Sequence, residues 1–154
     1  MIFDVMKRHI YFILLLIPIV GVCQEIPKKA DRIIVANDKT ASENFILVKQ
    51  ILADKGIEIA NQDKDINQIK SGSISITKYG ANGYFIFNCK DKNVLVTGMF
   101  KAGYEVSIGG VKGTDDFESI AFKGMNGSLY KASFEKMNDF AKLLGKDIKY
   151  EVSN

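Results

Sequence analysis

Hydrophobic and polar residues alternate most clearly between Tyr84 and Phe100, where two apolar arms flank the polar turn Lys90-Asp91-Lys92. This pattern predicts a β-hairpin. Successive side chains of a strand point to opposite faces, so the first arm divides into Phe85, Phe87 and Cys89 on one face and Tyr84, Ile86 and Asn88 on the other. Because both faces are largely apolar, we expect the hairpin to lie in the middle of a sheet, with helices covering at least one side.

Two further segments carry apolar residues at helical spacing. The first follows Thr40 and Glu43, which form a capping-box pair, and it ends before Gly56. Its apolar stripe is Ala41, Phe45, Val48, Ile51 and Leu52. The second is expected from Ser128 to Leu144, with Gly145 after it, and its stripe is Tyr130, Phe134, Met137, Ala141 and Leu144, with Phe140 beside it. We expect both stripes to pack against one face of the sheet.

The remaining apolar segments predict strands at 32–36, 57–61, 65–77, 104–108 and 147–152, with a bend at Gly72 in the third. Residues 109–127 form the least regular stretch. Runs of strands between two separated helices are typical of an α+β fold, an antiparallel sheet with two helices packed on one face. The sequence therefore predicts one α+β domain over residues 31–154, preceded by a tether at 24–30.

The first 23 residues predict a signal peptide. Lys7, Arg8 and His9 precede an apolar run over 10–22, which is too short for a transmembrane helix and suits a signal-peptide core. Met6 is a more typical start than Met1, and both remain open. We expect the product to be exported, to the periplasm, to the outer-membrane surface or as a secreted protein.

The end of the signal peptide leaves two alternatives. Val20-Gly21-Val22-Cys23 resembles a lipobox, in which Cys23 is lipidated and becomes the first residue. Cleavage after Cys23 would instead leave Gln24 first. Val22 is not the small residue that a lipobox places before its cysteine, so cleavage without lipid is favoured.

The composition limits the chemistry that the exported chain can perform. The sequence has 154 residues with 21 Lys and Arg, 18 Asp and Glu, and a net charge of +3. Removal of the signal takes the only His, His9, and one of the two Cys. Without His, the Ser-His-Asp and Cys-His mechanisms and the usual zinc sites are excluded. Cys89 is predicted to be a buried apolar residue. The net charge is too small to indicate nucleic acid as a partner.

A resemblance rests on five consecutive features: the first strand, the capped helix, the strand Gly56-Ile57-Glu58-Ile59, the turn Asp63-Lys64-Asp65 and the Ile-rich return strand. Together they resemble a family of uncharacterised secreted bacterial domains whose fold is similar to the TATA-binding protein. The same features also resemble lipoprotein accessory subunits of outer-membrane barrel assembly. The resemblance covers most of residues 30–145. It implies a TBP-like fold and an envelope location, and it supplies no catalytic residues.

The candidate site residues lie before the second helix. Lys123, Gly124, Asn126 and Ser128 lead into its N-terminus, where free N–H groups could hold an anion. Asp63-Lys64-Asp65 starts like a calcium loop but lacks the Gly and Glu that such a loop requires. The stretch 109–114 lacks the spacing of a phosphate loop. No cofactor or metal is therefore predicted.

These observations favour a non-enzymatic binding module of the envelope, or a secreted one, that contacts an envelope protein or another surface partner. No nucleic-acid partner is expected, and contact with a membrane is expected only through a lipid on Cys23. The alternative is a small-ligand-binding protein or a carboxylate-dependent hydrolase that uses the 109–128 loop. Its candidate acid and base residues are Asp115, Asp116 and Glu118.

Overall fold

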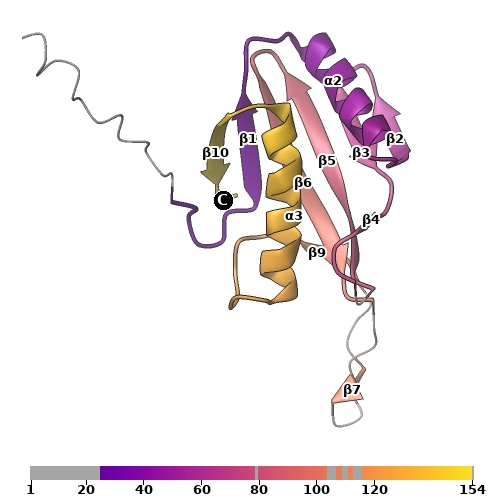
Figure 1. Ribbon diagram of the computed structural model, residues 1–154, viewed down its shortest axis with the longest axis vertical. Helices are drawn as coiled ribbons and strands as arrows, with labels where there is room; N and C mark the ends of the chain where they lie inside the picture. The colour runs from indigo at the N-terminus through magenta and orange to yellow at the C-terminus, as the bar shows by residue number, and fades with distance from the viewer. Residues whose placement is uncertain (1–24, 79, 104–106, 109–110, 113–115, 154) are drawn as a thin grey trace, which may run out of the picture.

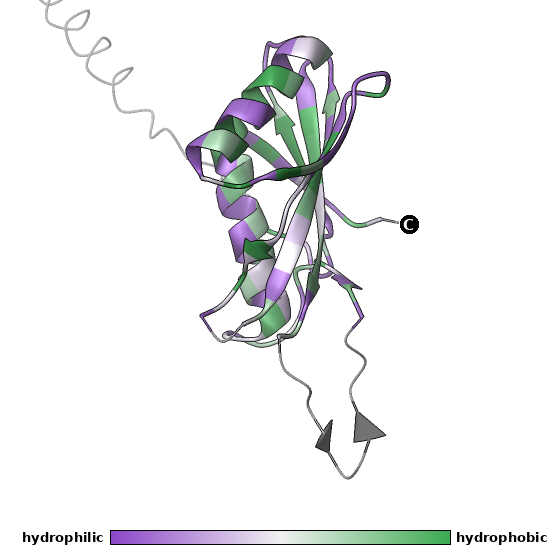
Figure 2. Cartoon of the chain, turned by 90° about the vertical axis from the view of Figure 1, so that its right-hand side faces the viewer, coloured by the Kyte–Doolittle hydropathy of each residue, from purple (hydrophilic) through white to green (hydrophobic). Residues whose placement is uncertain are grey.

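The computed structural model describes residues 25–78, 80–103, 107–108, 111–112 and 116–153. In these residues an eight-stranded antiparallel sheet is covered on one face by two helices, which Figure 2 shows on the same side of the sheet. This architecture confirms the predicted α+β class. The helices are α2 (Ala41–Asp54) and α3 (Leu129–Leu144).

The strands of the main sheet follow the spatial order β10-β1-β6-β5-β3-β2, and β4 pairs with β5 while β9 pairs with β6 (Figure 1). Their bounds are β1 Arg32–Ala36, β2 Ile59–Asp63, β3 Gln68–Ser71, β4 Ile74–Ser75, β5 Asn82–Lys90, β6 Asn93–Lys101, β9 Glu118–Ser119 and β10 Asp147–Glu151. A separate pair joins β7 (Ser107–Ile108) to β8 (Val111–Lys112).

The central hairpin is formed by β5 and β6, which pair from Asn82↔Lys101 to Lys90↔Asn93. Phe85, Phe87 and Cys89 are buried, and the Phe85 ring lies 5.2 Å from the ring of Phe140 on α3. The residues between them are half-buried on the other face. The predicted division of the hairpin into two faces is therefore confirmed, and the core lies between this hairpin and the helices.

Both helices begin and pack as their sequences predict. Thr40 caps α2 in a complete capping box with Glu43, and Ser128 caps α3. Eight residues of the two stripes, with Phe140 counted beside the second, are buried in the core: Phe45, Val48, Leu52, Phe134, Met137, Phe140, Ala141 and Leu144. None of the helices in the described part of the chain is long and apolar enough to span a membrane.

The return from β2 differs from the sequence prediction. The turn expected at Asp63-Lys64-Asp65 lies at 64–67, and the expected strand over 65–77 is divided into β3 and β4. The Asp63 carboxylate accepts hydrogen bonds from the backbone N–H groups of Asp65 and Ile66, and Asn67 adopts a left-handed φ of 51°. These local bonds replace strand pairing and delay the start of β3. Of the strand expected at 104–108, only 107–108 lie within the described residues.

Candidate anion-binding site at the start of α3

Two segments that are far apart in the sequence meet beside the N-terminus of α3. The backbone N–H of Lys29 donates to the carbonyl of Phe122 at 2.9 Å, and the N–H of Phe122 donates to the carbonyl of Ala30 at 2.7 Å. Ala30 is fully buried. The last residues of the predicted tether are thus held against the loop that leads from β9 to α3.

The loop before α3 turns through two glycines. Gly124 and Gly127 have φ values of +88° and +83°, which residues with a side chain rarely adopt. A Cβ atom on Gly124 would lie 2.6 Å from the Oγ of Ser128. That Oγ accepts a hydrogen bond from the backbone N–H of Lys131 and so caps the helix. The turn therefore requires glycine at position 124 for both its backbone and its packing.

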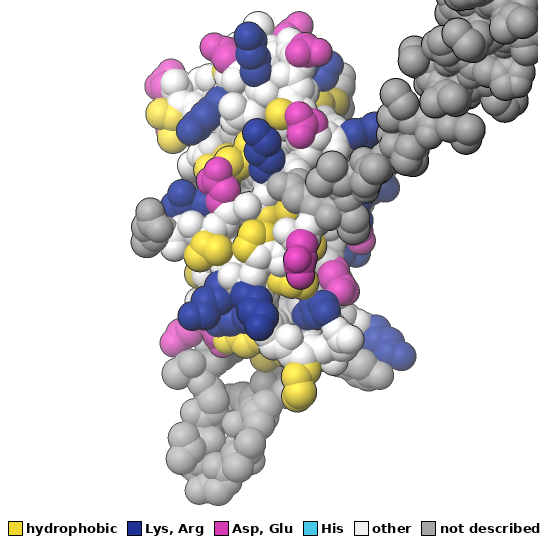
Figure 3. Space-filling model, turned by 90° about the vertical axis from the view of Figure 1, so that its left-hand side faces the viewer, with side chains coloured by type: hydrophobic (Ala, Val, Ile, Leu, Met, Phe, Trp, Pro, Cys, Tyr) yellow, Lys and Arg dark blue, Asp and Glu magenta, His cyan; other side chains and the backbone are white. Residues whose placement is uncertain are grey.

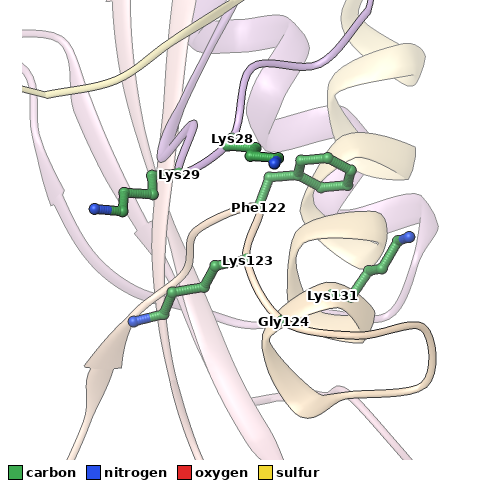
Figure 4. Close-up of a pocket in the computed structure, with 6 residues that line it drawn as sticks. All are labelled: Lys28, Lys29, Phe122, Lys123, Gly124 and Lys131. Atoms are coloured by element: carbon green, nitrogen blue, oxygen red, sulfur yellow. The ribbon is translucent and has the colours of Figure 1, made fainter.

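A cavity of about 310 Å³ opens between the tether and this loop (Figure 4). Its lining residues are Lys28, Lys29, Phe122, Lys123, Gly124 and Lys131. Four of the six are lysines and none is acidic. Among the described residues, no carboxylate forms an ion pair with any of these four lysines. Like charges gathered without counter-charges produce a positive local potential.

Two of the four ammonium groups lie close to aromatic rings. The Nζ of Lys123 lies 3.9 Å from the centroid of the Tyr130 ring. The Nζ of Lys131 lies 5.4 Å from the Phe122 centroid and also donates to the Oδ1 of Asn126. In Figure 4, Lys28 extends toward Phe122, Lys131 rises on the other side of this ring, and Lys29 and Lys123 extend away from it. The ammonium groups therefore lie near an apolar side chain and do not converge on one point.

The four residues singled out in the sequence lie together here. Lys123 and Gly124 line the cavity, Asn126 accepts from Lys131, and Ser128 caps the helix. Sequence reasoning missed Lys28, Lys29, Phe122 and Lys131. One local signal was available, because Lys131 occupies the third helical position, where a capping box has Glu or Gln.

Of the acidic residues of the alternative hypothesis, Asp116 and Glu118 do not line this cavity. Asp116 is exposed, and the Glu118 carboxylate accepts a hydrogen bond from the Tyr130 hydroxyl. This hydrogen bond is the main cause that raises the pKa of Tyr130 above its ordinary value. Asp115 lies outside the described residues. The carboxylate-dependent hydrolase stays a hypothesis, and Glu118 already has a structural partner.

Cys89 does not contribute to this site. Cys89 is buried in the central hairpin, and burial raises the pKa of its thiol to about 12, so that it stays protonated. Cys23 lies outside the described residues. Within the part of the chain that the structure describes, no group of three or more His, Cys, Asp or Glu side chains could hold a metal ion.

Two other cavities provide a comparison. One, of about 330 Å³, is lined by Ser42, Phe45, Ile46, Lys49, Lys64 and Asn67. The other, of about 230 Å³, contains a single lysine, Lys70, and lies beside the ring pair of Tyr84 and Phe117. Figure 3 shows one side of the molecule, with Lys and Arg side chains gathered in its lower half beside apolar side chains. The cavity at α3 has more lysines than either of the other two.

Known proteins offer no further guide to this site. No family model matches the chain, and no curated protein is detectably similar to it. The resemblance to a secreted TBP-like family therefore stays a prediction, and the candidate site rests on its own geometry and charge.

Proposed function

We propose that this chain is an exported, non-enzymatic binding module that contacts an anionic partner of the cell envelope at the cavity before α3. The observation that carries the proposal is the lining of this cavity, which among the described residues includes four lysines and no carboxylate. The chain as a whole has a net charge of only +3, so its general charge would attract polyanions weakly. The four lysines gathered at the cavity give this site its preference for an anionic group.

The start of α3 adds to this preference. The N-terminus of a helix carries a partial positive charge, which favours a nearby anion and disfavours a cation. Lys131 is a cation in the first turn of α3. A bound anionic group would offset the repulsion between Lys131 and the helix dipole as well as the repulsion among the lysines.

The predicted export of the chain supports a partner in the envelope. Lys28 and Lys29 follow directly after the predicted signal peptide and the first part of the tether. The exported chain would also lack His, which favours binding over most hydrolytic chemistry. The partner is accordingly an anionic group on an envelope component and not a nucleic acid.

The test is a calorimetric titration of the purified protein with inorganic polyphosphate at low salt. The double variant Lys123→Gln with Lys131→Gln should weaken binding by roughly twofold to thirtyfold, since exposed charge pairs contribute about 0.2–1 kcal/mol each. The matched control, Lys49→Gln with Lys64→Gln, removes two lysines from the second cavity and should leave binding nearly unchanged. Equal weakening by both variants, or no binding by the wild type, would overturn the proposal.

A further inference from the structure

We infer that the lysine cavity and the adjacent Met125 form a docking surface for an anionic lipid bilayer. This inference rests on the proposed function and specifies the partner. The surface consists of Lys28, Lys29, Lys123 and Lys131 around Phe122, together with Met125 in the same loop.

Met125 supplies the apolar part of the surface. Its side chain is 84% exposed, the highest value among the exposed large hydrophobic side chains of the described residues. It lies between Lys123 and Lys131 in the sequence, and the left-handed glycines at 124 and 127 shape the turn that presents it. A contact with the bilayer interface needs an apolar side chain that enters the headgroup region and cations that remain at its surface. This loop carries both.

The spacing of the ammonium groups favours a bilayer over a single small anion. A small anion is held by donors that converge on it, whereas Figure 4 shows the lysines on different sides of Phe122. A bilayer offers many phosphate groups over an area, so each lysine can meet a separate headgroup. The apolar centre of the surface also suits the acyl boundary below the headgroups.

The connectivity of the chain supports the same partner. Lys28 follows Cys23 by five residues, and five residues can span at most about 18 Å. The hydrogen bonds between Lys29, Ala30 and Phe122 tie this tether to the loop of Met125. A lipid on Cys23 would therefore bring the lysines to the bilayer, and one lipid combined with a basic patch is a usual combination for stable anchoring. Without a lipid, the same surface binds reversibly and in a salt-dependent way.

The first experiment measures flotation of the exported chain, residues 24–154, with vesicles of phosphatidylglycerol and phosphatidylcholine, and with vesicles of phosphatidylcholine alone. Binding is expected only to the anionic vesicles. Met125→Ser should reduce the bound fraction at least about fivefold, because an apolar side chain leaves the interface. The matched control is Ile46→Ser at the second cavity, where Ile46 is 55% exposed, and it should bind like the wild type.

The second experiment uses the absence of tryptophan in the sequence. Met125→Trp introduces a single tryptophan, whose emission should shift to shorter wavelength when anionic vesicles are added. Ile46→Trp should show no shift. This readout does not depend on a loss of binding, so it remains informative if Met125→Ser disturbs the loop.

The outcomes separate this inference from the proposed function. Binding of polyphosphate at the lysine cavity without binding to anionic vesicles would leave the proposed function intact and overturn the bilayer inference. Vesicle binding that is unaffected by Met125→Ser, or equal shifts at positions 125 and 46, would overturn it as well. Binding to neither probe would overturn both proposals.

Discussion

Helices α2 and α3 begin at opposite ends of the molecule (Figure 1), and their first turns differ in how polar groups are paired. At α2, Thr40 and Glu43 pair in a capping box, and the Asp91 carboxylate accepts from the N–H of Ala41 at 2.8 Å. At α3, Ser128 caps one N–H group, while lysines without carboxylate partners and an exposed methionine surround the turn. The polar groups at the start of α2 (the first end) are paired within the protein, whereas the start of α3 (the second end) presents its charged and apolar groups outward.

The same helical position shows this difference most directly. The third residue is Glu43 in α2 and Lys131 in α3. Glu43 agrees with the helix dipole and closes the cap, whereas Lys131 opposes the dipole and leaves the cap open. Natural sequences are locally consistent except where function requires otherwise. The comparison therefore indicates that the start of α2 serves stability, and it favours the proposal that the start of α3 serves binding.

The largest effect on stability is expected from Phe134→Ala, which removes a buried ring that packs against Phe122 near the start of α3. Phe134 is fully buried, and its ring lies 5.3 Å from Phe122, which lines the lysine cavity. Truncation of a buried Phe costs about 3–5 kcal/mol of unfolding free energy. Urea denaturation should show this loss, and polyphosphate binding should weaken with it. A change below about 1 kcal/mol would mean that α3 is not anchored through Phe134.

A smaller loss is expected from Asn44→Ala at the first end. Asn44 is fully buried, and its amide donates to the carbonyl of Lys90 at 2.9 Å and exchanges hydrogen bonds with Asn37. Removal takes away these part-buried hydrogen bonds, whose combined loss costs about 1–3 kcal/mol. Asn126→Ala, an exposed asparagine at the second end, should change stability by less than about 0.5 kcal/mol. Similar losses in both variants would contradict the division between the two ends.

The difference between the two helix starts also explains which features the sequence predicts well. Periodicity and caps are local, so the hairpin faces, both helix starts and the buried residues of the two helical stripes follow from the sequence. The lysine cavity joins Lys28 and Lys29 to residues of a distant loop. Only tertiary hydrogen bonds such as that from Lys29 to Phe122 bring them together. Neither the net charge nor any local motif records this contact.

The turn at Gly124 gives a third and smaller test. Gly124→Ala should cost about 1–2 kcal/mol from its left-handed φ, with a further loss because the new Cβ would meet the Oγ of Ser128. Gly127→Ala is the matched control, since it has a similar φ but no atom within 4 Å of the added Cβ. In thermal denaturation, Gly124→Ala should have a lower melting temperature than Gly127→Ala. The reverse order would show that the cap at Ser128 tolerates displacement.

The capping box predicts a pH dependence of stability at the start of α2. Hydrogen bonds from the backbone N–H and hydroxyl of Thr40 lower the pKa of Glu43 from its ordinary value of 4.5. A carboxylate with a lowered folded pKa stabilises the fold above its unfolded pKa, and this contribution is lost as the pH falls through the folded pKa. Glu43→Gln should therefore be less stable than the wild type near about pH 6, with the difference shrinking toward about pH 3. A constant difference over this range would contradict the role of the charged carboxylate.

The smallest change in stability, and the sharpest test of the comparison, is expected from Lys131→Glu. This substitution gives α3 the residue that α2 has at the same position, so it should complete a capping box with Ser128 and match the helix dipole. Removing an unfavourable charge at a helix N-terminus and adding a favourable one contributes about 0.3–1 kcal/mol each at an exposed site. The free energy of unfolding should therefore rise, while binding to polyphosphate and to anionic vesicles should fall. Lys136→Glu, an exposed lysine farther along α3, makes the same charge change outside the first turn and the cavity and should do neither. A gain in stability with unchanged binding would show that Lys131 is an imperfect cap without a role in recognition, whereas opposite changes in the two quantities would show that local stability is given up at this end for an anionic partner.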